Sequence, residues 1–581
     1  TTGTNNTAVG RGSLDNTTGS NNTAIGKDAL QQNTTGANNV AVGVLALDAN
    51  TTASANTAVG RASLSANTTG ASNTAVGYNS LVSNTTASNN TAVGTDTLSV
   101  NTTGTLNTAV GANALDANTT GGSNTAMGTN ALGVNTTASN NTAFGTSAIS
   151  DNETGTFLTA VGAYALDANT TGSSNVAIGK DALGANTTAD ENVAVGTKAL
   201  EVNTTGGANV AVGHRALDSN TTANSNTGVG YYTLSANTTG TNNTAVGKNA
   251  LITNTTGERN TALGVQAMGG TATGVTNSVA VGVNALYTTT SSSNTAVGDA
   301  ALYANTSGSL NVAIGRNALF DNTTGANNTA VGTYALDENT TGIQNVSVGT
   351  YALGENTTAN NNTCVGYAAL EKNTNGYSNT AVGSLALDAN TTGIQNNAFG
   401  YAALTANTTG SWNTALGEMS LAANTTAGNN TGLGHRALQA NTTGTENTAV
   451  GANCMDANAT GNYNDAFGKD ALGSGDGFTR CCAFGNSALK QNASNDNTAV
   501  GHQALTTNTT GHSLTAVGAY ALDANTTGDN NTAMGYLALT ANTTGYWNTA
   551  VGKDALESCT TGYGNTAVGH EALEDCTTGE R

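Results

Sequence analysis

The most reactive side chains belong to six cysteines, which all lie in the C-terminal part of the chain. Cys559 and Cys576 are 17 residues apart, and each replaces the asparagine of a recurring Asn-Thr-Thr segment. If these segments stack, neighbouring copies lie about 4.8 Å apart, which brings the two thiols within reach of a disulfide. The simpler interpretation is that both are small substitutions that remain free. Neither the cysteines nor the five scattered histidines have metal-site spacing, so we expect no metal and no other cofactor.

Asparagine is the second candidate for chemistry, because Asn-x-Thr recurs in nearly every repeat. In a host with the machinery, this sequence is an acceptor for N-glycosylation. The candidate acceptors are Asn16, Asn33, Asn101 and Asn118. A hydrogen-bonded ladder of stacked asparagines explains the same recurrence without any sugar.

Enzyme chemistry finds no support in the sequence, and we expect no catalytic residues. No His–carboxylate–nucleophile set, P-loop or dinucleotide fingerprint stands out from the repeat. The formal net charge of −20 argues against nucleic acid as a partner, because phosphate binding needs clustered cations. No run of 18 apolar residues exists, so no membrane span is expected.

A repeat of 17 residues organises the chain and positions all of these residues. The unit reads T-A-V-G-x-x-A-L-x-x-N-T-T-G-x-N-N, and its first glycine recurs about 34 times between Gly10 and Gly569. Asn-Thr-Thr-Gly segments would break any helix, whereas short β-rich runs between Asn and Gly turns are typical of a solenoid. We therefore predict an all-β fold. It is a parallel β-solenoid (β-roll) with two short strands per coil, continuous over residues 1–581.

Alternation along the first strand predicts which residues line the interior. The residue before each glycine is apolar. The fourth residue after each glycine is leucine or, in a few coils, isoleucine or methionine. The predicted core ladder therefore includes Val9, Gly10, Leu14, Ile25, Gly26, Leu30, Val42, Gly43 and Leu47.

The residue two positions before the glycine is always small, and alternation then points it outward. Its ladder is a candidate contact with another chain, and it begins with Ala8, Ala24, Ala41 and Ala58. The alternative is that tight curvature of the coil limits the size of this residue.

Residues at the corners of the repeat vary from coil to coil, which predicts exposure. The candidate surface-binding residues are Tyr231, Tyr232, Trp412 and Trp547. Exposed aromatic side chains can bind a host glycan or receptor. Unconstrained decoration of the corners is the alternative interpretation.

The repeat resembles the head repeat of the YadA-like trimeric autotransporter adhesins, whose core is similar to Asn-Ser-Val-Ala-Ile-Gly. Residues 277–282 read N-S-V-A-V-G. Similar repeats occur in bacteriophage tail fibres. The resemblance covers the whole chain and implies a left-handed parallel β-roll, three chains per fibre and adhesion to host surfaces.

These patterns together lead us to expect a structural or adhesive fibre, located outside the cell, on a cell surface or on a virion. A homo-oligomer is expected, either a trimer or an end-to-end filament, and a subunit of an open-ended filament or of a phage tail fibre is the alternative function. Ice binding by rows of outward-facing threonines is a remote third function. Because the chain starts at Thr1 and shows no signal peptide, we expect a mature or excised piece of a longer protein.

Overall fold

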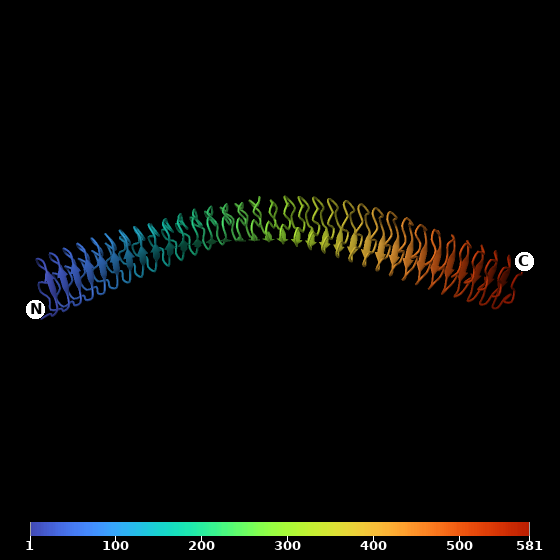
Figure 1. The fold of residues 1–581 in the computed structure, drawn as a ribbon, viewed down its shortest axis with the longest axis horizontal. Coiled ribbons are helices and arrows are strands. Elements are labelled where there is room, and N and C mark those ends of the chain that lie inside the picture. The colour runs from blue at the N-terminus through green and yellow to red at the C-terminus, as the bar shows by residue number, and fades with distance from the viewer. Residues whose placement is uncertain (1, 580–581) are drawn as a thin grey trace. The chain divides into compact units, whose positions relative to one another are not determined.

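The computed structural model describes residues 2–579, and no helix occurs in that range. The chain divides into two compact units, Thr1–Ser292 and Ser293–Arg581. In each unit, every coil of about 17 residues contributes one three-residue strand, and successive strands stack in chain order (Figure 1). The predicted parallel β-solenoid is therefore confirmed. The continuity of a single array over residues 1–581 stays a prediction.

The strands of the first unit come from its successive coils. They are β1 (Thr7–Val9), β2 (Thr23–Ile25), β3 (Val40–Val42), β4 (Thr57–Val59), β5 (Thr74–Val76), β6 (Thr91–Val93), β7 (Thr108–Val110), β8 (Thr125–Met127), β9 (Thr142–Phe144), β10 (Thr159–Val161), β11 (Val176–Ile178), β12 (Val193–Val195), β13 (Val210–Val212), β14 (Thr227–Val229), β15 (Thr244–Val246), β16 (Thr261–Leu263) and β17 (Val279–Val281).

The strands of the second unit follow the same pattern. They are β18 (Thr295–Val297), β19 (Val312–Ile314), β20 (Thr329–Val331), β21 (Val346–Val348), β22 (Thr363–Val365), β23 (Thr380–Val382), β24 (Asn397–Phe399), β25 (Thr414–Leu416), β26 (Thr431–Leu433), β27 (Thr448–Val450), β28 (Asp465–Phe467), β29 (Cys482–Phe484), β30 (Thr498–Val500), β31 (Thr515–Val517), β32 (Thr532–Met534), β33 (Thr549–Val551) and β34 (Thr566–Val568).

Within each unit the strands pair in parallel and without a shift of register. Ala41 of β3 lies opposite Ala24 of β2 and Ala58 of β4. Each side chain therefore faces its own equivalent one coil away, and each repeat position forms a continuous row along the stack.

The interior of the coil is narrow and is filled by small side chains around one leucine. In the third coil Ala41, Ala46 and Leu47 are fully buried, and Asn50 is buried with them. A Cβ added to Gly228, which occupies the alanine position of β14, would lie 3.4 Å from Cδ1 of Leu217. The alanine of the strand therefore packs directly against leucine across the coil.

The predicted orientation of the strand is wrong, because the alanine row faces inward and the valine row faces outward. Ala24, Ala41 and Ala58 are fully buried, whereas Val9 and Ile25 are exposed. Val42 is only half-buried. The strand has three residues, and the buried asparagine that precedes it shares its face with the alanine. The leucine half of the predicted core ladder is correct, since Leu14, Leu30 and Leu47 are buried.

The predicted second strand is absent, because the segment after the glycine is a series of turns. Leu45 and Leu47 have φ values of 61° and 55°, in the left-handed region. A strand needs φ near −120°. The chain turns sharply at these two corners, and the leucine reaches the interior from a left-handed backbone rather than from a strand.

The glycine that ends each strand is required by both conformation and space. Gly60 has a φ of 137°, and a Cβ built on it would lie 2.3 Å from the carbonyl oxygen of Gly77 in the next coil. Only glycine allows this close stacking of backbone on backbone.

Two ladders of buried asparagine side chains connect successive coils. In the first ladder, Asn50 donates from Nδ2 to Oδ1 of Asn33 at 2.9 Å. In the second, Oδ1 of Asn22 accepts from the backbone N–H of Asn39 at 2.9 Å. Asn50 and Asn39 also both donate to the carbonyl oxygen of Ala53. The amides thereby satisfy backbone groups that would otherwise be buried without partners.

Candidate functional surface

The outer face of the sheet carries an apolar row, which we call the outer stripe and define as the third residue of each strand. Its members include Val246, Phe399 and Leu416, which are between 37% and 46% exposed. Phe467 and Phe484 stack on each other within it, with ring centroids 4.5 Å apart. Each unit thus presents a row of 17 apolar side chains, an exposed area on the order of several hundred Å².

The first residue of each strand lies on the same outer face beside the stripe. It is usually threonine and sometimes valine, as in Thr57 and Val40, and both of these side chains are half-buried. The outer face therefore presents parallel rows of β-branched side chains, hydroxyl-bearing in one row and apolar in the other.

The predicted chain-contact ladder lies elsewhere and cannot make the proposed contact. Ala24, Ala41 and Ala58 are inside the coil, and only Ala8 of β1 is exposed. The outer stripe is the apolar surface that a second chain could reach.

Aromatic clusters occupy the corner after the glycine, where the sequence predicts exposed residues. Tyr231 stacks on His214 with centroids 5.4 Å apart, and Tyr232 meets Tyr231 edge-on at 4.5 Å. The guanidinium of Arg215 lies 5.7 Å from the centroid of the Tyr232 ring. Tyr231 is exposed and Tyr232 is half-buried. The cluster could offer stacking surfaces to a ligand.

The two tryptophans lie at the opposite corner, before the strand, and both are exposed. Trp412 donates from Nε1 to Oε1 of Gln395 at 2.6 Å. Trp547 is 64% exposed and borders a hollow of about 500 Å³, together with Tyr563, Gly564 and Thr566. The structure therefore leaves all four predicted surface residues at least partly accessible, and it places them in separate clusters.

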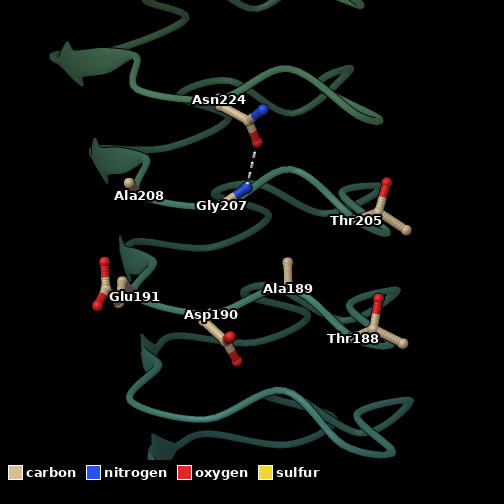
Figure 2. Close-up of a pocket in the computed structure, with 8 residues that line it drawn as sticks. All are labelled: Thr188, Ala189, Asp190, Glu191, Thr205, Gly207, Ala208 and Asn224. Atoms are coloured by element: carbon tan, nitrogen blue, oxygen red, sulfur yellow. Dashed lines mark hydrogen bonds between the residues drawn. The ribbon is translucent and has the colours of Figure 1, made fainter.

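A shallow trough of about 460 Å³ lies in the first unit (Figure 2). It is lined by Thr188, Ala189, Asp190, Glu191, Thr205, Gly207, Ala208 and Asn224. Gly207 leaves the space for it by lacking a side chain, and its N–H donates to Oδ1 of Asn224 at 2.7 Å. The lining is hydroxyl- and carboxylate-rich, which suits a polar ligand rather than an apolar one.

Three of the four candidate glycosylation sites are inaccessible. Asn33, Asn101 and Asn118 are fully buried, and their side chains form the first asparagine ladder. Asn16 is exposed, because the first repeat is one residue shorter and Thr17 takes the ladder position. The ladder interpretation of this motif is thereby confirmed for the three buried residues.

Cys559 and Cys576, the candidate disulfide pair, are free thiols in the structure, which agrees with the simpler interpretation. Cys559 is buried in the position of a ladder asparagine, and burial raises the pKa of its thiol. Its presence also ends the ladder, because Oδ1 of Asn542 in the preceding coil has no hydrogen-bond partner.

Several aspartates that follow the core leucine are half-buried rather than freely solvated. Burial raises the pKa of Asp48, Asp116 and Asp167, and it raises the pKa of Asp337 to about 7. Near Asp337, the carboxylates Glu338 and Asp321 add to the rise. These groups give each unit a pH-dependent charge along one edge.

One cluster of metal-type ligands occurs in the part of the chain that the structure describes, at Asp554, His570 and Glu571. The sequence does not reveal it, because the residues lie in successive coils and resemble the ordinary corner variation. Within residues 2–579, no helix is long and apolar enough to cross a membrane.

No protein-family model matches this chain, and no match is found among the curated proteins. The stacked coil and its outer face are therefore the observations on which a function can be based.

Proposed function

We propose that this chain is a non-catalytic structural fibre whose solenoid acts as a shaft and presents repeated weak binding sites. The observation that carries the proposal is the in-register stacking, which repeats one outer face in every coil of each unit. Repetition of weak contacts gives avidity without a deep pocket. The resemblance to YadA-like head repeats supports a location outside the cell, on a cell surface or on a virion.

The fibre associates with further copies of itself through the outer stripe. A row of apolar side chains this long is rarely left exposed on a monomer. In this arrangement the valine row, rather than the alanine row, provides the contact. A trimer and an open-ended filament are both compatible with it, and the same shaft could serve as part of a phage tail fibre.

Sedimentation velocity tests this association. The parent chain is expected to sediment as an oligomer. The double variant Val212→Lys/Val246→Lys is expected to shift the chain toward the monomer. Leu106, an exposed leucine at a corner away from the stripe, provides the control, and Leu106→Lys should leave the oligomer intact. A parent chain that remains monomeric at about 100 µM would remove the association from the proposal.

Adhesion uses the exposed aromatic corners as contacts for a host glycan or receptor. Binding to a glycan array and to cultured cells should fall several-fold in Trp412→Ala and Trp547→Ala. Tyr303→Ala changes an aromatic residue outside these clusters and should have no effect. Equal binding by all of these variants would mean that the corners are unconstrained decoration.

Ice binding is a second candidate, favoured by one specific observation. The outer face carries a row of threonines beside a row of valines, as in Thr57 and Val59, in successive in-register strands. Thermal hysteresis of the purified chain tests this candidate. Its absence at millimolar concentration would eliminate the candidate.

A further inference from the structure

The corner after the glycine brings three metal-type ligands together at the last two strands of the second unit. Asp554, His570 and Glu571 each offer one ligand atom, and these atoms lie within 4.8 Å of one another. Asp554 and Glu571 occupy the same repeat position in successive coils. The backbone bond from Glu571 N–H to the carbonyl oxygen of Lys553, at 2.9 Å, holds the two corners in register.

Asp554 is buried more deeply than an ordinary surface carboxylate. Its side chain is 9% exposed, and its Oδ1 has no hydrogen-bond partner. The other oxygen, Oδ2, contacts the ammonium of Lys553. A buried carboxylate oxygen without a partner is costly unless a cation or a donor reaches it.

The repeat supplies its own comparison, because three other coils carry a Lys-Asp pair at this corner. Asp28, Asp181 and Asp470 are 18%, 20% and 22% exposed, at least twice as much as Asp554. In the coil that follows each of them, the equivalent of Glu571 is Leu45, Lys198 or Ser487, and none of these is an anionic ligand. The grouping of ligands is therefore a property of the 554–571 corner and not of the Lys-Asp pair.

The electrostatic surroundings favour a cation at this corner. Glu557, Glu574 and Asp575 lie close enough to interact with the cluster, and Lys553 is the nearby fixed positive charge. The pKa of Glu574 is raised, first by desolvation and then by the neighbouring carboxylates. An excess of negative charge of this kind concentrates divalent cations.

We propose that Asp554, His570 and Glu571 form a binding site for a divalent transition-metal ion of the zinc or cobalt class. One imidazole and two carboxylates suit such an ion better than calcium, which prefers an all-oxygen set of six to eight ligands. Three protein ligands leave a further position for water or for a group from a binding partner. Binding would join two successive coils by a cross-link at the corner, in addition to the hydrogen bonds that Asn565 makes to Oδ1 of Asn548.

The ligands need only small movements to close around the ion. Ligand atoms around a tetrahedral zinc with bonds of about 2.1 Å are about 3.4 Å apart, compared with up to 4.8 Å here. His570 and Glu571 are exposed side chains that can rotate, and their Nδ1 and Oε1 atoms are already 3.5 Å apart. The Lys553 ammonium competes with the ion for Asp554.

Cobalt(II) titration of the full chain, stripped with a chelator, tests the site by calorimetry and by visible absorption. One ion per chain is expected, and His570→Ala and Glu571→Gln should each weaken binding by at least about tenfold. Lys553→Ala should strengthen it several-fold. Asp181→Asn, the matched corner without the other ligands, should change nothing. The two ligand variants are exposed, so the folded state should survive, which circular dichroism verifies.

The cysteines of the same coils, Cys559 and Cys576, are the main source of adventitious binding. A thiolate ligand produces a near-ultraviolet charge-transfer band with cobalt, whereas the proposed nitrogen and oxygen ligands do not. Binding that shows this band and disappears on alkylation of the thiols would overturn the proposal. Unchanged affinity in His570→Ala, or no measurable binding by the parent chain, would overturn it as well.

Discussion

At the scale of single residues, the glycine that ends each strand is the least replaceable position in the repeat. A Cβ on Gly60 would lie 2.3 Å from a backbone oxygen, and its φ of 137° is unfavourable for any other residue. Gly60→Ala should therefore lower stability by about 3 kcal/mol or more. Urea unfolding, followed by circular dichroism, measures the change.

Gly228→Ala is the matched control for this glycine. Gly228 takes the position that alanine fills in most coils, and its added Cβ meets only leucine carbons and a backbone oxygen at ordinary distances. Its stability should be unchanged or slightly higher. A similar loss of stability in Gly60→Ala and Gly228→Ala would show that the close stacking of glycine on glycine is not the reason why Gly60 resists substitution.

The raised pKa of Asp337, about 7, predicts a pH-dependent stability. Burial is its main cause. Between pH 4 and pH 7 the folded chain holds a proton that the unfolded chain releases, so Asp337 makes the chain less stable as pH rises through this range. Asp337→Asn should raise stability at pH 8 by about 1 kcal/mol, after a discount for partial solvation, and should have little effect at pH 4.

The melting temperature of the parent and of Asp337→Asn at the two pH values measures this difference. Asp15→Asn, which changes an exposed aspartate, provides the control. Its melting temperature should equal that of the parent at both pH values. A gain at pH 4 equal to that at pH 8 would mean that the substitution acts through packing and not through charge.

The cysteines should differ strongly in reactivity. Burial raises the pKa of Cys364 and Cys454 to about 12 and that of Cys481 to about 11. The thiolate is the reactive form, so these three should resist iodoacetamide at pH 8 in the folded chain. Cys576, which is half-exposed, should react. Peptide mapping by mass spectrometry distinguishes them, and rapid alkylation of Cys364 before unfolding would contradict the assigned burial.

At the scale of the strand and its turns, the sequence predicts the period, the parallel stacking and the position of the buried leucine. These follow from a repeat in which Leu47 and its equivalents never become polar. The face of the strand could not be predicted by alternation alone. Both Ala41 and Val42 are apolar, and the deciding fact is that the coil is too narrow for two large side chains. Leu47 fills it, so the small Ala41 faces inward.

The missing second strand has a similar physical origin. Period-2 patterning cannot reveal that Leu47 adopts a left-handed φ of 55°, because leucine rarely does so. Stacking of identical corners fixes this conformation in every coil. The metal-type cluster was missed for another reason: the 17-residue period places Asp554 and Glu571 in one row, but His570 and Glu571 resemble the ordinary variation of this corner.

The inward-facing alanine row gives a prediction at this scale. Ala245→Leu should destabilise the first unit by about 2–3 kcal/mol, because Ala245 is fully buried in a packed interior. Val246→Thr, one residue along, should cost less than about 0.5 kcal/mol, since the side chain faces outward. Urea unfolding of both variants provides the measurement. A larger loss of stability in Val246→Thr than in Ala245→Leu would instead support an orientation with valine inside the coil.

At the scale of the whole molecule, stability and function both depend on the number of coils. One coil supplies one buried leucine and two buried alanines, which is too little to fold alone, so the ladders between coils stabilise each unit. The same repetition multiplies the outer stripe and the corner clusters. The variable corner residues, such as Trp412, follow no pattern that the repeat imposes, so the repeat alone does not predict a binding partner.

X-ray diffraction from crystals or aligned samples of the purified chain tests the stacked coil most directly. The predicted result is a strong reflection near 4.8 Å along the stacking axis, with density for one short strand per coil and with alanine inside. Helical density, separate globules, or two strands per coil with valine inside would contradict this account.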